Sequence, residues 1–342
     1  MKKHIGIILI FSLLLSGVYA QKAPLIDDFI NQGIKLYDKG DYADAIFRYK
    51  KALLMDPRSS RANYEIASTY LAAKDYENAV KHSDLVIEVN QEYTDQAYIV
   101  KGSAQDLMGK PLDAVKTYKK GIEKIKTNNL LFYNLALTHF KLKDYKETEE
   151  ALQQALTIDP YHASSHFLLA LNMLFANQRV KGILALYNYL LLEPKQARTA
   201  SALQTLEEEM QKGVTKAEDK TTNITIPEKR EKDEFSSAEL LLDLLASSNS
   251  NETNKGKSAQ ELFIENSNSL FNMLGELKKD KKGFWWDFYV DYFYTLASNK
   301  HTEAFCYYIT QSKGDAYDIW LKDNMPKIEA FSTWYTGYLH KL

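Results

Sequence analysis

Two histidines have the spacing that would suit a metal ion. His162 and His166 lie four residues apart, so on a helix both would face the same side, as two ligands of a zinc ion do. The residues between them are small, no glutamate follows His162 directly, and no third ligand is evident nearby. His166 also falls on a packing position of the repeats described below. The pair therefore predicts structural histidines and no metal site.

The other reactive residue types give no stronger signal. Cys306 lies between Phe305 and Tyr307 in an apolar stretch, whereas a nucleophilic cysteine needs a lowered thiol pKa. Residues 207–209 are three glutamates, which most simply form a solvated helix face. The sequence has no glycine-rich phosphate loop and no GxSxG or HExxH motif. It therefore predicts a protein that is not an enzyme, with no catalytic residues and no cofactor.

Length and charge limit the class of protein. The 342 residues are enough for two or three domains. A net charge of −2 gives no electrostatic reason to expect nucleic acid as a partner. The single cysteine excludes a disulfide scaffold. What remains is an ordinary soluble protein that is rich in tyrosine.

The first 20 residues have the pattern of an export signal. A basic start at Lys2 and Lys3 precedes an apolar run over residues 5–15, and small residues stand at Val18 and Ala20. The run is shorter than the ~20 residues of a membrane span, and no cysteine follows it for lipid attachment. We expect cleavage after Ala20 and a periplasmic or secreted protein without a stable membrane anchor. An uncleaved anchor is the alternative.

Internal repeats are the strongest signal in the chain. One series of mostly small residues recurs at intervals of 34 or 35: Gly33, Ala67, Gly102, Ala136 and Ala170. A second series follows twelve residues later: Ala45, Ala79, Ala114, Thr148 and Gly182. Prolines close three of the units: Pro57, Pro160 and Pro194.

Each unit has the pattern of two helices. Apolar residues fall at helical spacing, a short break such as residues 39–42 follows, and a second helix runs towards the proline. Small residues at Gly33 and Ala45, or Ala67 and Ala79, would let the two helices approach closely. The sequence therefore predicts a series of helical hairpins.

In period, helix pattern and small-residue positions, residues 26–196 resemble five tetratricopeptide repeats. The resemblance implies an all-α fold, a right-handed superhelical solenoid of hairpins whose concave face is lined by the first helices and binds partner proteins. Local departures include Gln91 in place of the closing proline of repeat 2, and Thr148 and Gly182 for alanine. These departures loosen packing without changing the fold that the resemblance implies.

The expected concave face is largely apolar and aromatic. The Lys, Asn and Arg residues of the carboxylate-binding members of this family are absent from it. We expect a protein or peptide partner in this groove, although at least half of its residues would also serve packing between repeats. The candidate partner-binding residues are Tyr37, Tyr64, Tyr133, Leu137, Phe140, Phe167 and Leu171.

The remaining sequence suggests three further segments. A capping helix completes a solenoid over residues 21–212, and residues 213–257 read as a flexible linker around a short leucine-rich helix at 236–247. We expect the groove to hold this helix, or a similar helix of a partner. The alternative is that the helix packs on the C-terminal region and leaves the groove free. That region, residues 258–342, is helical and rich in aromatic residues, as a degenerate repeat or an unrelated bundle would be.

Two classes of function follow. The first is a non-enzymatic scaffold of the bacterial cell envelope that holds a protein or peptide in its groove. The alternative is an enzyme or glycan-binding protein whose active part is the aromatic C-terminal region. Exposure of the four tryptophans separates these classes, because an aromatic binding platform must face solvent. They are Trp285, Trp286, Trp320 and Trp334.

Overall fold

The computed structural model describes residues 24–212, 214–216, 222–224, 234–249, 254 and 256–339. The predicted signal peptide, residues 1–20, lies outside them. The structure confirms the all-helical fold class, with helices paired in hairpins and one short strand pair. The chain divides into two compact units, residues 1–158 and 159–342. The predicted domain boundaries after residues 212 and 257 remain predictions.

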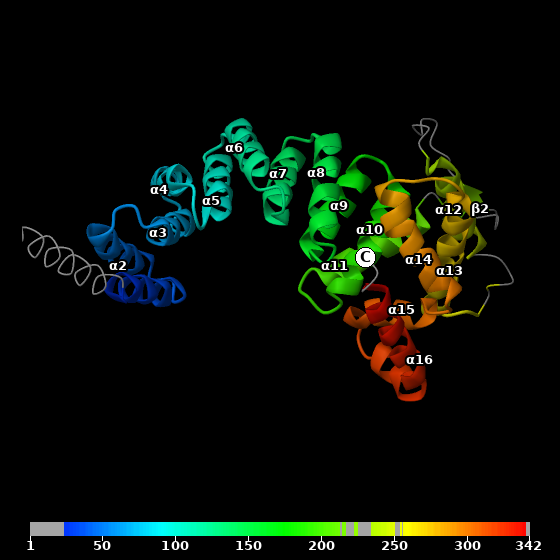
Figure 1. The fold of residues 1–342 in the computed structure, drawn as a ribbon. Coiled ribbons are helices and arrows are strands. Elements are labelled where there is room, and N and C mark those ends of the chain that lie inside the picture. Colours follow the sequence, from blue (N-terminus) through cyan, green and yellow to red (C-terminus); the bar gives the residue numbers. More distant parts are fainter. Residues whose placement is uncertain are drawn as a thin grey trace, which may run out of the picture. The chain divides into compact units, whose positions relative to one another are not determined.

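The first unit consists of consecutive helical hairpins (Figure 1). Its first helix covers residues 24–37. The next helices are α2 (Tyr42–Met55), α3 (Ser60–Ala72), α4 (Tyr76–Val89), α5 (Thr94–Leu107), α6 (Pro111–Lys124), α7 (Asn129–Lys141) and α8 (Tyr145–Ile158). α3 pairs with α4, α5 with α6, and α7 with α8. These pairs are the hairpins that the repeat pattern predicts.

The turn within each hairpin has the same backbone form. A residue with positive φ lies two positions before the second helix, in the left-handed conformation that often ends a helix. In chain order these residues are Gly40 (φ 82°), Lys74 (63°), Gly109 (75°), Lys143 (60°) and Asn177 (57°). They recur with the period of the sequence, so the turn is part of the repeated unit.

The second unit begins with the fifth hairpin and continues to the C-terminal helices. The helices of the hairpin and the cap are α9 (Ala163–Phe175), α10 (Arg179–Leu192) and α11 (Thr199–Gln211). The later helices are α12 (Ser236–Ser248), α13 (Ala259–Lys278), the π-helix η2 (Trp285–Val290), α14 (Asp291–Ser298), α15 (Thr302–Ile309), the 3₁₀-helix η3 (Gln311–Lys313) and α16 (Ala316–Leu339). α16 is interrupted by non-helical backbone at Asn324, two residues before Pro326.

Helix α10 is the centre of the second unit. Helices α9, α11, α12, α15 and η2 pack against it, and side chains of α13 contact its Tyr187. Residues 179–191 are therefore buried except Asn188. Tyr187 is fully buried, with its hydroxyl 2.6 Å from Oγ of Ser267. Its ring packs against four others: Phe263, Phe271, Phe293 and Phe305. The aromatic cluster predicted for the C-terminal helices therefore forms a core together with the last repeat.

The stretch predicted as a flexible linker contains regular structure. Strands β1 (Val214–Lys216) and β2 (Thr222–Ile224) pair antiparallel, with Val214 opposite Ile224. The predicted leucine-rich helix is α12. The remaining parts of the linker, residues 213, 217–221, 225–233, 250–253 and 255, lie outside the described residues.

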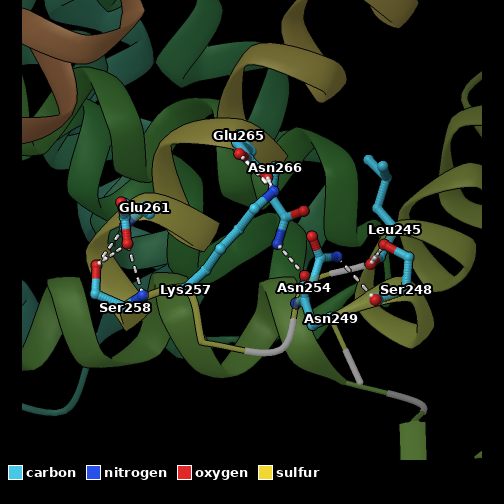
Figure 2. A network of polar contacts seen from close by, with 9 residues as sticks. All are labelled: Leu245, Ser248, Asn249, Asn254, Lys257, Ser258, Glu261, Glu265 and Asn266. Carbon is cyan, nitrogen blue, oxygen red and sulfur yellow. Dashed lines mark hydrogen bonds and ion pairs between the residues drawn. The ribbon is translucent and has the colours of Figure 1, made fainter. Parts of the chain in front are cut away.

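Polar contacts lie at the end of α12 and at the start of α13 (Figure 2). Ser258 and Glu261 form a capping box at the start of α13, which satisfies backbone N–H groups that the helix cannot bond internally. Nδ2 of Asn266 on α13 donates to Oδ1 of Asn249, which follows α12, over 2.9 Å. These contacts fix the end of α12 beside the first turns of α13.

The α14–α15 turn shares one feature with the five hairpins. Lys300 has φ 60° and lies two residues before α15, as in the repeats. In the five hairpins, small residues such as Gly33 and Ala45 lie on either side of this turn. At the same distances from Lys300, the chain has Phe293 and Phe305, whose ring centroids are 5.8 Å apart. Both α14 and α15 pack against α13. A degenerate repeat in this region remains a prediction.

Candidate functional site

Five of the predicted groove residues lie in the first unit, and all are half-buried. Tyr37 lies at the end of the first helix, Tyr64 on α3, and Tyr133, Leu137 and Phe140 on α7. Helix α5 lies beside both α3 and α7, so the first helices of successive hairpins form a row. A side chain that lines a groove and also packs between repeats is expected to be half-buried. Their role in binding remains a prediction.

Aromatic contacts hold several of these side chains in place. Tyr64 stacks on Tyr93, with ring centroids 5.1 Å apart and planes at 13°. The ring centroids of Tyr37 and Tyr42 are 5.5 Å apart. Those of Phe140 and Tyr145, the first residue of α8, are 6.4 Å apart. Rings fixed in this way lose little side-chain freedom when a ligand binds, which favours recognition.

Polar contacts cross from one repeat to the next at the repeat spacing. Nη1 of Arg61 lies 3.1 Å from Oδ1 of Asp27, 34 residues earlier, and its Nη2 donates to Asn31 over 3.0 Å. Lys141 pairs with Asp106 over 2.5 Å, 35 residues earlier. The sequence reasoning missed these pairs. Opposite charges separated by one period were the signal that could have found them.

A carboxylate pair lies in the same row of helices. Glu65 on α3 is half-buried, Asp38 at the end of the first helix is exposed, and neither makes an ion pair within the described residues. Burial raises the pKa of Glu65, the charge of Arg61 opposes this, and the charge of Asp38 raises it further. Because Arg61 already bonds Asp27 and Asn31, it does not pair with Glu65.

The other two predicted groove residues belong to the second unit. Phe167 on α9 packs on Tyr189 with ring centroids 4.9 Å apart, and the guanidinium of Arg198 lies 5.2 Å from its centroid. Leu171, one turn later on α9, is half-buried. Arg198 therefore covers part of the predicted groove surface at Phe167. The repeat pattern did not predict this contact, because Arg198 lies outside the helices of the repeats.

Helix α12 packs within the second unit, on α10, α11 and α13. Nη1 of Arg179 donates to Oδ1 of Asp243 over 2.6 Å, and both side chains are almost fully buried. A carboxylate oxygen of Glu239 accepts from the backbone N–H of Val180 over 2.8 Å. These contacts correct the prediction that this leucine-rich helix docks into the groove. The helix also packs on α13, so the alternative in which it packs on the C-terminal region is right in part, because α12 lies on both α10 of the last repeat and α13.

The candidate chemical residues are structural. His166 is fully buried, with Nε2 2.9 Å from the carbonyl oxygen of Pro160 and Nδ1 2.6 Å from the hydroxyl of Tyr289. Burial lowers the pKa of His166 to about 4, and burial raises the pKa of the Cys306 thiol to about 12. Among the described residues, no three His, Cys, Asp or Glu side chains are placed to hold a metal ion.

The tryptophans belong mostly to the core. Trp285, Trp286 and Trp320 are buried, and Trp334 is half-buried against Tyr292. They therefore do not form the exposed aromatic platform on which the alternative function depends.

Within the described part of the chain, no helix combines the length and apolar composition needed to cross a bilayer.

Two segments of the chain match family models described as tetratricopeptide repeat, at residues 36–100 and 130–162. Both segments coincide with the observed hairpins of 34-residue period. These two segments are tetratricopeptide repeats.

Curated relatives match parts of this chain. Small glutamine-rich tetratricopeptide repeat-containing protein 2 of Saccharomyces cerevisiae is 27% identical over 140 residues, which are 41% of this chain and 38% of that protein. TPR repeat-containing protein YpiA of Bacillus subtilis is 30% identical over 132 residues, 38% of this chain and 31% of that protein. Protein O-mannosyl-transferase TMTC3 of Homo sapiens is 38% identical over 79 residues, 23% of this chain and 9% of that protein. The chain thus spans less than two fifths of each of these relatives.

Solved structures with similar helices are also repeat proteins. YrrB, described as a TPR protein with an unusual peptide-binding site, is 17% identical with a TM-score of 0.41, and the match covers 52% of this chain and 89% of YrrB. PilF of Pseudomonas aeruginosa is 15% identical with a TM-score of 0.45, and the match covers 56% of this chain and 90% of PilF.

Proposed function

We propose that this protein is a non-enzymatic scaffold that holds an extended segment of a partner protein along the first helices of its repeats. The observation that supports this most is the row of half-buried aromatic and apolar side chains in the first unit, Tyr37, Tyr64, Tyr133, Leu137 and Phe140. Apolar side chains that gather on one face of a soluble protein usually mark an interaction site.

The charges of the same row indicate what the partner segment carries. Glu65 and Asp38 have no cation bound to them within the described residues, and Tyr37 and Tyr64 are their chain neighbours. A lysine or arginine side chain would neutralise the two carboxylates and could also lie over a tyrosine ring. We therefore propose a partner segment that combines apolar residues with at least one basic residue.

Export to the bacterial cell envelope is part of the proposal. Its support is the basic start, apolar run and small residues at positions 1–20. Intact-mass measurement of the exported protein tests this, with a mature chain beginning at Gln21 as the expected result. Retention of residues 1–20 in a membrane fraction would contradict it.

Crosslinking from the envelope of the source cell, followed by purification of the tagged full chain, tests the scaffold. Leu137→Glu should reduce recovery of a bound partner about tenfold, because it puts a charge in the apolar row. Leu54→Glu is the matched control, since Leu54 on α2 is 85% exposed. Equal recovery with both variants would show that the row is not the binding surface.

Binding at increasing salt tests the charge of the partner. The variant carrying both Glu65→Gln and Asp38→Asn should bind more weakly and with less dependence on salt, because it removes the carboxylates that attract the basic residue. Glu77→Gln on α4 is the control, because Glu77 is exposed on the second helix of its hairpin. An unchanged salt dependence would rule out a basic partner segment while leaving the scaffold proposal intact.

A further inference from the structure

A cleft of about 360 Å³ lies in the second unit, apart from the predicted groove. Its walls come from α11, α13 and η3 and from the end of α12. Amide and charged side chains supply the larger share of its lining, and Met210, Leu262 and Phe263 supply an apolar part. A mainly polar lining with an apolar patch suits a ligand that is rich in hydrogen-bonding groups.

The charges of the cleft cancel within it. Glu207 on α11 and Lys313 on η3 are its two charged lining residues, and they form an ion pair with each other. An anionic, cationic or zwitterionic ligand would have to compete with this pair for its partners. A neutral ligand leaves the pair intact, and the cleft therefore favours neutral compounds.

Three side-chain amides supply the hydrogen-bonding groups. Asn266 donates from Nδ2 to Oδ1 of Asn249 over 2.9 Å, as Figure 2 shows. Within the described residues, this bond leaves a hydrogen of the Asn249 amide nitrogen and the amide oxygen of Asn266 able to bond a ligand. Gln211 on α11 adds a third amide at the exposed side of the cleft. Each amide offers both donors and acceptors.

We propose that this cleft binds a neutral saccharide of one or two sugar rings. Sugar hydroxyls both donate and accept hydrogen bonds, so they match side-chain amides in either orientation. The C–H face of a sugar ring is apolar and matches Leu262, which is half-buried at the cleft. This site differs from the aromatic platform expected from the sequence, because it relies on amides in a cleft and the tryptophans take no part.

Saturation-transfer NMR and calorimetry with the full chain test the proposal. The probes are glucose, galactose, mannose, N-acetylglucosamine and maltose, with glucuronate and glucosamine as charged counterparts. At least one neutral sugar should bind with a Kd of about 1 mM or below, and the charged counterparts should bind about tenfold more weakly. No binding of any neutral sugar at about 20 mM, or tighter binding of a charged one, would overturn the proposal.

Variants on α11 locate the binding site. Gln211→Ala should weaken binding about 3- to 10-fold, the usual effect of losing one hydrogen bond. Gln204→Ala is the control, because Gln204 is exposed on the same helix and bonds Glu208. The double change Asn249→Ala and Asn266→Ala should abolish binding, with a melting curve confirming that the variant is folded. Equal loss with Gln204→Ala and Gln211→Ala would place binding elsewhere and reject the cleft.

Discussion

The ring of Tyr49 lies directly against the backbone of Gly33. A Cβ atom on Gly33 would be 2.4 Å from Cε1 of Tyr49, far inside contact distance. Gly102 and Tyr118 repeat the relationship two hairpins later, again at 2.4 Å. The sequence pattern paired Gly33 with Ala45, but the nearest atoms belong to Tyr49. A glycine on the first helix therefore makes room for a tyrosine on the second.

Replacing Gly33 by alanine should destabilise the protein by about 1–3 kcal/mol, because the added methyl group overpacks against Tyr49. Repeat 4 has alanine and leucine at the equivalent positions, Ala136 and Leu152. The variant with both Gly33→Ala and Tyr49→Leu should therefore be more stable than the sum of the two single changes. Urea unfolding of the four proteins measures this coupling, and additive effects would contradict the pairing.

Replacing Ala79 by leucine should also destabilise the protein by about 1–3 kcal/mol. Ala79 and Ala67 are both fully buried in the hairpin of α3 and α4, so added methylene groups have no space. Leu54→Ala, at a side chain that is 85% exposed, is the control and should leave the melting curve nearly unchanged. A melting temperature of the Ala79→Leu variant within a degree of wild type would mean that the repeat positions are misassigned.

Replacing Asp243 by asparagine should destabilise the second unit by about 3–5 kcal/mol, because it leaves the buried charge of Arg179 without its partner. Hydrogen exchange should show loss of protection first in α12, which Asp243 anchors to α10. Asp84→Asn is the matched control. Its pair with Lys101 is at the surface, with Asp84 51% exposed, and should contribute about 0–1 kcal/mol. Similar effects of the two changes would show that the buried pair is not an anchor.

Acid should destabilise the second unit through His166. Burial lowers the pKa of folded His166 from the ordinary 6.5 to about 4, so between these values the unfolded chain binds the proton and the folded chain does not. The free energy of unfolding should therefore fall as the pH drops from about 6.5 to about 4. The free energy of unfolding of the His166→Gln variant should fall less steeply over this range. Urea unfolding at several pH values measures it. His301→Gln, at a less buried histidine, is the control.

The five hairpins could be predicted from the sequence because their signals are local and repeated. Three features of each hairpin depend only on residues within one period. They are the helix length, the turn after the first helix, and the small residue on that helix, as at Gly33, Ala67 and Gly102. The row of groove residues on the first helices followed from the same period. The structure confirms the hairpins, and it shows the groove residues half-buried on those helices.

Contacts between distant segments could not be read from the sequence. The sequence of α12 predicts a helix with an apolar face, but many surfaces of a protein could bind such a face. The buried ion pair between Arg179 and Asp243 determines that α12 packs on α10. The rings of the C-terminal region likewise predict a core without naming its centre, Tyr187. The cleft beside Gln211 and Asn266 also exists only once α11, the end of α12, α13 and η3 meet. Local periodicity determined the repeats, whereas complementary packing of remote side chains decided how the second unit closes around α10.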